Sequence, residues 1–97
     1  MRFSWDPKKN EANLTERGFD FGFASLIFEG PTLERLDDRR VYGDRRVLAI
    51  GLAQGVHLTV AYTDRGVPDQ EIKRRIISAR RSNRRERKAY REAVAKG

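Results

Sequence analysis

The hydrophobic period changes at Gly30-Pro31, and this change constrains the fold more than any other feature of the chain. Before it, residues 21–28 place apolar side chains three and four positions apart, which is the period of an amphipathic helix. After it, residues 56–63 alternate apolar and polar side chains, as a half-buried strand requires. Helices that precede short strands predict an α+β fold, in which helices segregate to one face of an antiparallel sheet.

Two helices are expected before the change of period. The Asp-Pro pair at residues 6–7 is typical of a helix start, because Asp caps the free amides and proline fits the first turn. We expect this helix to end at about residue 17, with Gly18 in a left-handed conformation. Asp20 can cap a second helix over residues 21–28. The two helices together would cover one face of the sheet.

Five strands are expected, joined by turns that contain glycine, proline or charged residues. They cover residues 2–5, 32–37, 46–52, 56–63 and 71–79, with connecting loops at 38–44 and 64–70. Because the strands are short and several of the turns are tight, the sheet should be antiparallel. The length of the chain predicts a single domain over residues 1–97.

A basic helix follows directly from the last strand. Asn83 and Glu86 have the spacing of an N-cap and its partner three residues later, so a helix should start near Arg84. Residues 73–97 contain eleven Lys or Arg and two acidic residues, a net charge of +9 in a chain of net charge +7. Such a local charge indicates a surface for a polyanion or an acidic protein. The apolar residues expected to anchor the segment are Ile72, Ile76, Ile77, Ala89, Tyr90 and Val94.

Composition limits the chemistry that the chain can perform. There is no cysteine, and His57 is the one histidine, so a zinc site of the cysteine or histidine type is not expected. The one acidic pair, at residues 37–38, would point to opposite sides of a strand, so no two-metal site is expected. No apolar run approaches the ~20 residues that span a bilayer, and no signal-peptide pattern is present. We expect a cytoplasmic protein without metal or other cofactor.

Three blocks of residues carry a resemblance to a known family. They are Phe3, Trp5, Asp6, Pro7 and Lys9 with Asn13, Leu14, Gly18 and Phe21; Asp44, Arg46, Ile50 and Gly51 with Leu58, Val60, Tyr62, Thr63, Arg65 and Gly66; and residues 75–81 and 84–87 with Tyr90. Together they resemble the BrnT family, the toxins of bacterial type II toxin–antitoxin pairs. The resemblance implies a RelE-like fold and a growth-inhibiting ribonuclease that a BrnA-like ribbon-helix-helix antitoxin neutralises. Arg17 stands where the family often has histidine, so a mechanism based on that imidazole is not expected here.

RNA cleavage by internal transesterification needs a base for the 2′-hydroxyl, a cation for the charge on phosphorus and an acid for the 5′-oxygen. Arginine, lysine and tyrosine can serve without a metal, as in RelE-like enzymes. Candidate catalytic residues are Lys9, Arg46, Arg65, Arg75, Arg80 and Tyr90, and candidate RNA-binding residues are Arg81, Arg84, Arg85 and Arg87. Arg75 and Arg80, at the two ends of one strand, could each bind phosphate bidentately.

Structural roles compete with several of these assignments. Lys9, Asn13 and Arg17 share a helix face and could form an exposed polar stripe. Arg46 could pair with Asp44, and Tyr90 could pack with its hydroxyl at the sheet edge. His57 is assigned to structure. Trp5 and Phe3 are assigned to the core, although an exposed Trp5 could stack a base.

Two other functions remain open from the residues alone. The chain could be a non-catalytic nucleic-acid-binding module, because phosphate binding explains a basic helix equally well. The basic helix could also be a docking surface for an acidic partner, and an antitoxin that covers an RNA site would combine both roles. A homodimer or a toxin–antitoxin heterotetramer is possible.

Overall fold

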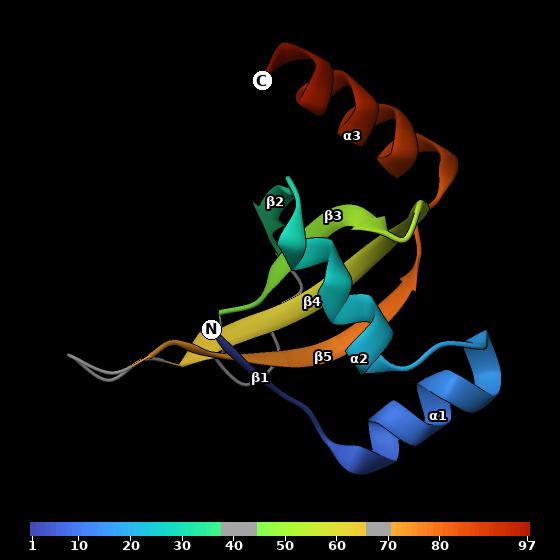
Figure 1. Cartoon of the computed structure of the whole chain (residues 1–97), viewed down its shortest axis with the longest axis vertical. Helices are drawn as coiled ribbons and strands as arrows, with labels where there is room; N and C mark the ends of the chain where they lie inside the picture. The colour runs from blue at the N-terminus through green and yellow to red at the C-terminus, as the bar shows by residue number, and fades with distance from the viewer. Residues whose placement is uncertain (38–44, 66–70) are drawn as a thin grey trace.

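The structure, a computed structural model, describes residues 1–37, 45–65 and 71–97. Its elements are β1 (Arg2–Ser4), α1 (Pro7–Arg17), α2 (Phe21–Ala24), the 3-10 helix η1 (Ser25–Glu29), β2 (Leu33–Leu36), β3 (Val47–Ala53), β4 (Val56–Arg65), β5 (Lys73–Arg81) and α3 (Arg84–Lys96). The strands form one sheet in the order β1-β5-β4-β3-β2 (Figure 1). This arrangement confirms the α+β class.

The sheet is mixed, so the prediction of a purely antiparallel sheet was wrong. Strands β2 to β5 pair antiparallel, but β1 runs parallel to β5, with Phe3 opposite Arg74. The amide of Arg2 also donates to the carbonyl of Ile72 at 3.2 Å. A hairpin turn forces antiparallel pairing only on strands that it joins. Because β1 and β5 lie at opposite ends of the chain, no turn decided their relative direction, and alternation of side chains does not encode it.

The helix ends follow the predicted capping residues. The Asp6 carboxylate accepts a hydrogen bond from the amide of Lys8, and Gly18 ends α1 with a φ of 83°. At α3, Asn83 and Glu86 form a complete capping box. The second predicted helix is correctly capped by Asp20, but it is one turn of α-helix followed by the 3-10 helix η1. These caps are local, which is why the sequence predicts them well.

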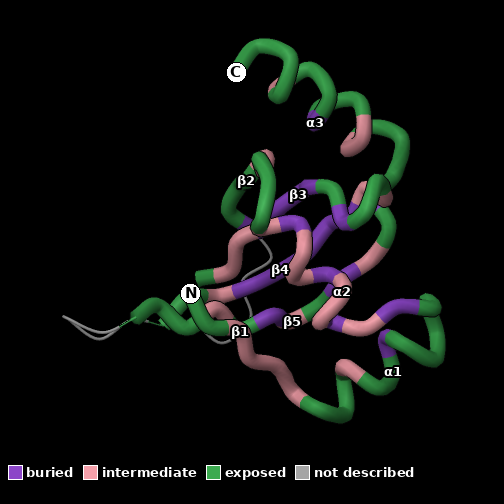
Figure 2. The backbone as a smooth tube through the Cα atoms, viewed as in Figure 1, coloured by how far each residue is buried: buried purple, intermediate pink, exposed green. Residues whose placement is uncertain are grey.

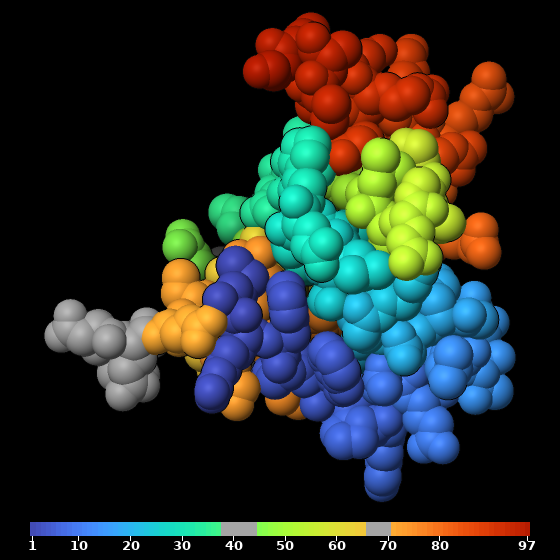
Figure 3. All heavy atoms as spheres, viewed as in Figure 1, coloured from blue at the N-terminus to red at the C-terminus, as the bar shows by residue number. Residues whose placement is uncertain are grey.

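The hydrophobic core lies between α2 with η1 and one face of the sheet, here called the core face. Figure 2 shows the buried residues gathered here, and Figure 3 shows α2 and η1 covering this face. The largest fully buried side chains are Phe21, Ile27, Leu58, Ile76 and Val60. A Cβ on Gly51 of β3 would lie only 2.8 Å from the Cβ of Ile27, so the bare backbone lets η1 approach closely. Phe3 and Trp5 pack against this core, as predicted.

The opposite face of the sheet, here called the second face, carries polar and basic side chains from β4 and β5. Its cross-strand pairs are Thr59 with Arg80, Ala61 with Ser78, and Thr63 with Arg75. A bulge between Ala61 and Tyr62 shifts the register, so that Ile77 has no partner on β4. The extra residue matters because Arg75 and Arg80, five positions apart, would otherwise point to opposite faces.

Helix α3 extends from the end of the sheet and packs mainly against β2 and β3 (Figure 1). Most of its residues are exposed (Figure 2). Tyr90 and Ile76 are buried, at 4% and 1% exposed, so these two predicted anchors are confirmed. Ile72 and Val94 are 47% and 43% exposed, and Ala89 is also exposed, so the prediction was wrong for these residues. Ile77 is partly buried.

Candidate nucleic-acid interface

A basic depression lies where α1 meets the second face of the sheet. It has a volume of about 320 Å³, and its lining includes Lys9 and Arg17 from α1, Arg46 just before β3, and Ser78 from β5. The carboxylate of Glu16 is the one acidic group among its lining residues. Three cations against one carboxylate leave the depression with a positive balance, which suits an anionic ligand.

Arg46 has one buried donor, its Nε, without an acceptor within the described residues. Asp44, the predicted ion-pair partner of Arg46, lies outside those residues, and so does Asp38 of the acidic pair at 37–38. A buried N–H donor without an acceptor costs free energy, so such a group calls for an explanation.

The predicted polar stripe on α1 has two different parts. Asn13 is buried, and its Nδ2 donates to the carbonyl of Phe19 at 2.9 Å, which holds the turn between α1 and α2. Lys9 and Arg17 are exposed, and both line the depression. The structure therefore brings Lys9 together with Arg46, as expected for two candidate catalytic residues, and adds Arg17 to them.

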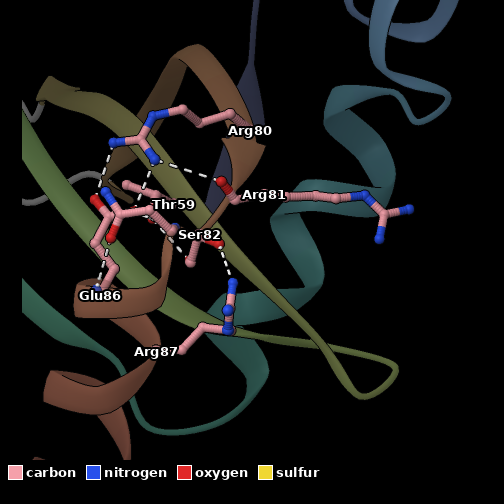
Figure 4. A network of polar contacts seen from close by, with 7 residues as sticks. Thr59, Arg80, Arg81, Ser82, Glu86 and Arg87 are labelled. Atoms are coloured by element: carbon pink, nitrogen blue, oxygen red, sulfur yellow. Dashed lines mark hydrogen bonds and ion pairs between the residues drawn. The ribbon is translucent and has the colours of Figure 1, made fainter.

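Arg80 is held in a polar network at the start of α3 (Figure 4). Its Nη1 and Nη2 donate to the two carboxylate oxygens of Glu86, at 2.7 and 2.9 Å. Glu86 Oε1 also accepts from the Thr59 hydroxyl at 3.1 Å and from the amide of Asn83 at 2.8 Å. The hydrogen bonds from Arg80 are the main reason why the pKa of Glu86 falls to about 2. This carboxylate stays charged at every physiological pH.

Arg75 is exposed and lies on the second face with Ser78 and Arg80. Arg75 and Arg80 are separated by roughly 13 Å, because their partners Thr63 and Thr59 are four residues apart on β4 and a strand rises about 3.3 Å per residue. Two guanidinium groups at that separation are too far apart to bind the same phosphate. Arg65, predicted to lie in a loop, is instead the exposed last residue of β4, opposite Lys73. It lies at the opposite end of the strand from Thr59 and Arg80.

Arg81 points away from Arg80 and from the second face (Figure 4). It lines a separate hollow of about 340 Å³ whose other walls include Leu14, Phe19 and Phe23. The alternation of side chains along β5 explains this, because neighbouring residues of a strand face opposite ways. The structure therefore does not bring Arg81 together with the other predicted RNA-binding arginines.

The three predicted RNA-binding arginines of α3 differ in their surroundings. Arg84 and Arg85 are exposed in the first turn, and Arg85 borders a groove of about 340 Å³ between α3 and the sheet. Arg87 is partly buried, and its Nη1 donates to the carbonyl of Ser82 at 2.8 Å. This bond ties α3 to the end of β5. Arg84 and Arg85 are therefore better placed than Arg87 to meet a large ligand.

Tyr90 takes part in the packing of α3. Its hydroxyl donates to the carbonyl of Pro31 at 2.8 Å, and its ring meets the ring of His57 edge to face, with 5.7 Å between the centroids. Burial is the main cause that lowers the pKa of His57, and the nearby Arg91 and Arg87 lower it further. These contacts match the structural alternative for Tyr90 and the structural assignment of His57.

Three residues received no functional role from the sequence patterns: Ser78, which lines the depression, Glu86, which binds Arg80, and Arg74. Ser78 was part of a matched block but received no role, and Glu86 was interpreted only as a helix cap. Arg74 was counted among the basic residues, but it packs over aromatic rings on the core face. The capping spacing could have drawn attention to Glu86, because a capping carboxylate is free to accept further donors. No local signal identifies Arg74.

Within residues 1–37, 45–65 and 71–97, no three His, Asp or Glu side chains lie close enough to hold a metal ion. None of the helices in those ranges is long and apolar enough to cross a membrane. The sequence-based expectation that the protein works without a cofactor stays a prediction.

The fold and the depression define a small, basic α+β protein with a surface suited to anions. A family described as "Ribonuclease toxin, BrnT, of type II toxin-antitoxin system" matches residues 5–86, and the chain belongs to this family. No curated protein matches the chain. Membership implies RNA as the substrate and an antitoxin as the partner. The matched region contains every candidate site residue except Arg87 and Tyr90.

Proposed function

We propose that this ribonuclease toxin cleaves RNA by metal-independent transesterification in the depression between α1 and the second face. The observation that carries the proposal is the depression in which Lys9, Arg17 and Arg46 meet, with Glu16 as the one acidic group among its lining residues. A phosphodiester offers two non-bridging oxygens, and a guanidinium group can bind both of them. In this position Arg46 would also stabilise the additional negative charge of the transition state.

The surrounding residues fit two further parts of such a reaction, an acid for the 5′-oxygen and cations for the flanking phosphates, and in the open depression the 2′-hydroxyl proton can pass to water. Lys9 is exposed at the edge of the depression and can donate a proton to the departing 5′-oxygen. Arg75 and Arg80 on the second face would bind flanking phosphates and hold the strand in register. The exposed Arg84 and Arg85 would attract RNA electrostatically. The reaction consumes the 2′-hydroxyl, so DNA of the same sequence should not be cleaved.

We further propose the cellular setting that the resemblance implies. The toxin would act in the cytoplasm, inhibit translation by degrading RNA, and have a RelE-like fold. Its partner would be a BrnA-like ribbon-helix-helix antitoxin that covers the basic surface, and the toxin would form a homodimer or a toxin–antitoxin heterotetramer. The net charge of +7 supports an acidic or mixed-charge partner segment, because complementary charge speeds association.

The test compares Arg46→Ala with Arg45→Ala. Arg45 is the neighbouring exposed arginine and is the matched control. Purified proteins are incubated with RNA in EDTA, in Mg²⁺ and with ribosomes present, and product ends are analysed for 2′,3′-cyclic phosphate. We expect cleavage in EDTA, a loss of about 10²–10³-fold in kcat/KM for Arg46→Ala, and little change for Arg45→Ala.

Three results would contradict parts of this proposal. Cleavage only with Mg²⁺ would show that metal independence is wrong. Equal losses in the two variants would move the reaction away from the depression. RNA that is bound but left intact in every condition would favour the non-catalytic binding module, which the exposed arginines of α3 can also support.

A further inference from the structure

Glu86 binds more donors than a helix cap requires. In a capping box the carboxylate accepts one hydrogen bond from the N-cap amide, which here belongs to Asn83. The same carboxylate also receives two bonds from Arg80 and one from Thr59. The Glu86 side chain is only 11% exposed, whereas that of Arg80 is 39% exposed. The carboxylate is therefore enclosed, and the arginine that it holds reaches the surface.

The bonds to Glu86 occupy one edge of the Arg80 guanidinium. They use Nη1 and Nη2, and Nη1 also lies 3.4 Å from the carbonyl of Arg81. A guanidinium group has five N–H donors, and Nε with the second hydrogen of Nη2 forms another two-pronged edge. That edge has no hydrogen-bond partner among the residues that the structure describes. Arg80 can therefore bind a phosphate through its free edge without releasing Glu86.

We infer that Glu86 is a positioning residue that orients Arg80 toward an RNA phosphate on the second face. The inference rests on the proposed function for its ligand. Glu86 is fixed at the first turn of α3 and Thr59 is on β4, so the network joins helix and sheet around the arginine. A free arginine loses rotamer entropy when it binds, and an arginine already held in place loses less. Fixing Arg80 therefore favours binding.

The test is a double-mutant cycle between Glu86→Gln and Arg80→Ala. Glu92→Gln is the matched control, because it removes the same charge from an exposed position of α3. The Kd is measured with a 2′-O-methyl oligoribonucleotide, which cannot be cleaved, so binding is read even if the protein proves inactive. Turnover is measured separately with the unmodified RNA.

We expect Arg80→Ala to weaken binding about tenfold in the wild-type background, the effect of one charge-assisted contact. In the Glu86→Gln background the same change should weaken it less than about threefold, because Arg80 is no longer oriented. In the Glu92→Gln background the loss should remain about tenfold. With cleavable RNA, Glu86→Gln should lower kcat more than it raises KM, since misplacement affects the reacting geometry.

The inference depends on the sign of the coupling between Glu86 and Arg80 in RNA binding. Equal losses in both backgrounds, or no loss from Arg80→Ala in either, would overturn it. A larger loss in the Glu86→Gln background would mean that Glu86 competes with RNA for Arg80, which would also overturn it. If Glu86→Gln does not fold by circular dichroism, Thr59→Val replaces it, because this change removes one donor to Glu86 and keeps the side-chain shape. Absence of cleavage by the wild type, with the coupling intact, would reject only the proposed reaction.

Discussion

The guanidinium group of Arg74 lies over the ring of Tyr62, with 3.9 Å between Cζ and the ring centroid. The same group binds Asp64 through Nε and Nη2, at 2.7 and 2.8 Å, and lies 4.7 Å from the ring centroid of Phe28. The hydroxyl of Tyr62 donates to Glu34 at 2.6 Å. Burial is the main cause that raises the pKa of Tyr62, and the bond to Glu34 raises it further. One arginine of the basic segment thus belongs to the core face.

Arg74→Ala should therefore lower the free energy of unfolding. Arg75→Ala should weaken RNA binding and leave that free energy nearly unchanged. The first change removes two charge-assisted hydrogen bonds and two ring contacts, and we expect a loss of about 2 kcal/mol in the free energy of unfolding. The second removes an exposed side chain on the second face and should change that free energy by less than about 0.5 kcal/mol. Urea unfolding followed by Trp5 fluorescence measures both. Similar losses for the two variants would contradict the division of β5 into two faces.

Local signals in the sequence predicted much of the fold. Caps at Asp6, Asp20 and Asn83 and the stop at Gly18 act within a few residues, and each is present in the structure. The apolar side chains of the alternation over β4, at Leu58, Val60 and Tyr62, lie in the core as predicted. Thr59 and Ala61 between them are buried too, so the prediction of a half-buried strand was wrong. The basic character of α3 and its start at Arg84 were also predicted correctly. These features can be predicted without knowing which strands pair in the sheet.

Features that depend on strand pairing were not predictable in the same way. The bulge beside Tyr62 determines that Arg75 and Arg80 share the second face while Arg74 lies on the core face. A register shift of one residue exchanges the two faces, and no turn in the sequence reveals where it occurs. The depression has the same origin, because Lys9 and Arg46 come from distant elements that meet only in the folded chain.

Tyr90→Phe separates the structural and catalytic roles of this residue. The change removes the hydrogen bond to the carbonyl of Pro31 and leaves the ring against His57. We expect the free energy of unfolding to fall by about 1 kcal/mol, the typical net contribution of one hydrogen bond. The value of kcat for RNA cleavage should stay within about twofold of the wild type. A fall in kcat of about 10² or more, without a matching loss of stability, would assign the hydroxyl to proton transfer.

The Arg80–Glu86 pair should make stability depend on pH in the acid range. The pKa of Glu86 is about 2 in the folded protein, against an ordinary value of 4.5. Because the folded pKa is lowered, the contribution is fully present above about pH 4.5 and is lost as the pH falls toward 2. The difference in unfolding free energy between wild type and Glu86→Gln should thus be constant from pH 7 to about 5 and shrink below that.

Chemical denaturation at a series of pH values measures this difference, with Glu92→Gln as the control for removal of a charge from α3. The control should differ from the wild type by a small amount, because the charge that it removes is exposed. A difference for Glu86→Gln that stays the same down to pH 2 would show that the carboxylate does not stabilise the fold through its charge.

The salt dependence of RNA binding should show which arginines contact the RNA. The paired tests are the exposed Arg84 and Arg85 of α3 and Arg81 at the end of β5. Binding to single-stranded RNA releases counterions, and each neutralised phosphate contributes about −0.7 to the slope of log K against log salt. Replacing the exposed Arg84 and Arg85 together by alanine should reduce the magnitude of that slope by roughly 1.4. Arg81→Ala should leave the slope unchanged, because Arg81 points away from the second face toward the hollow beside Phe19 and Phe23.

Fluorescence anisotropy with a 2′-O-methyl oligoribonucleotide over a range of NaCl concentrations gives the slopes. A reduction of about 0.7 from Arg81→Ala would show that RNA also contacts the side of the protein that carries α1 and α2.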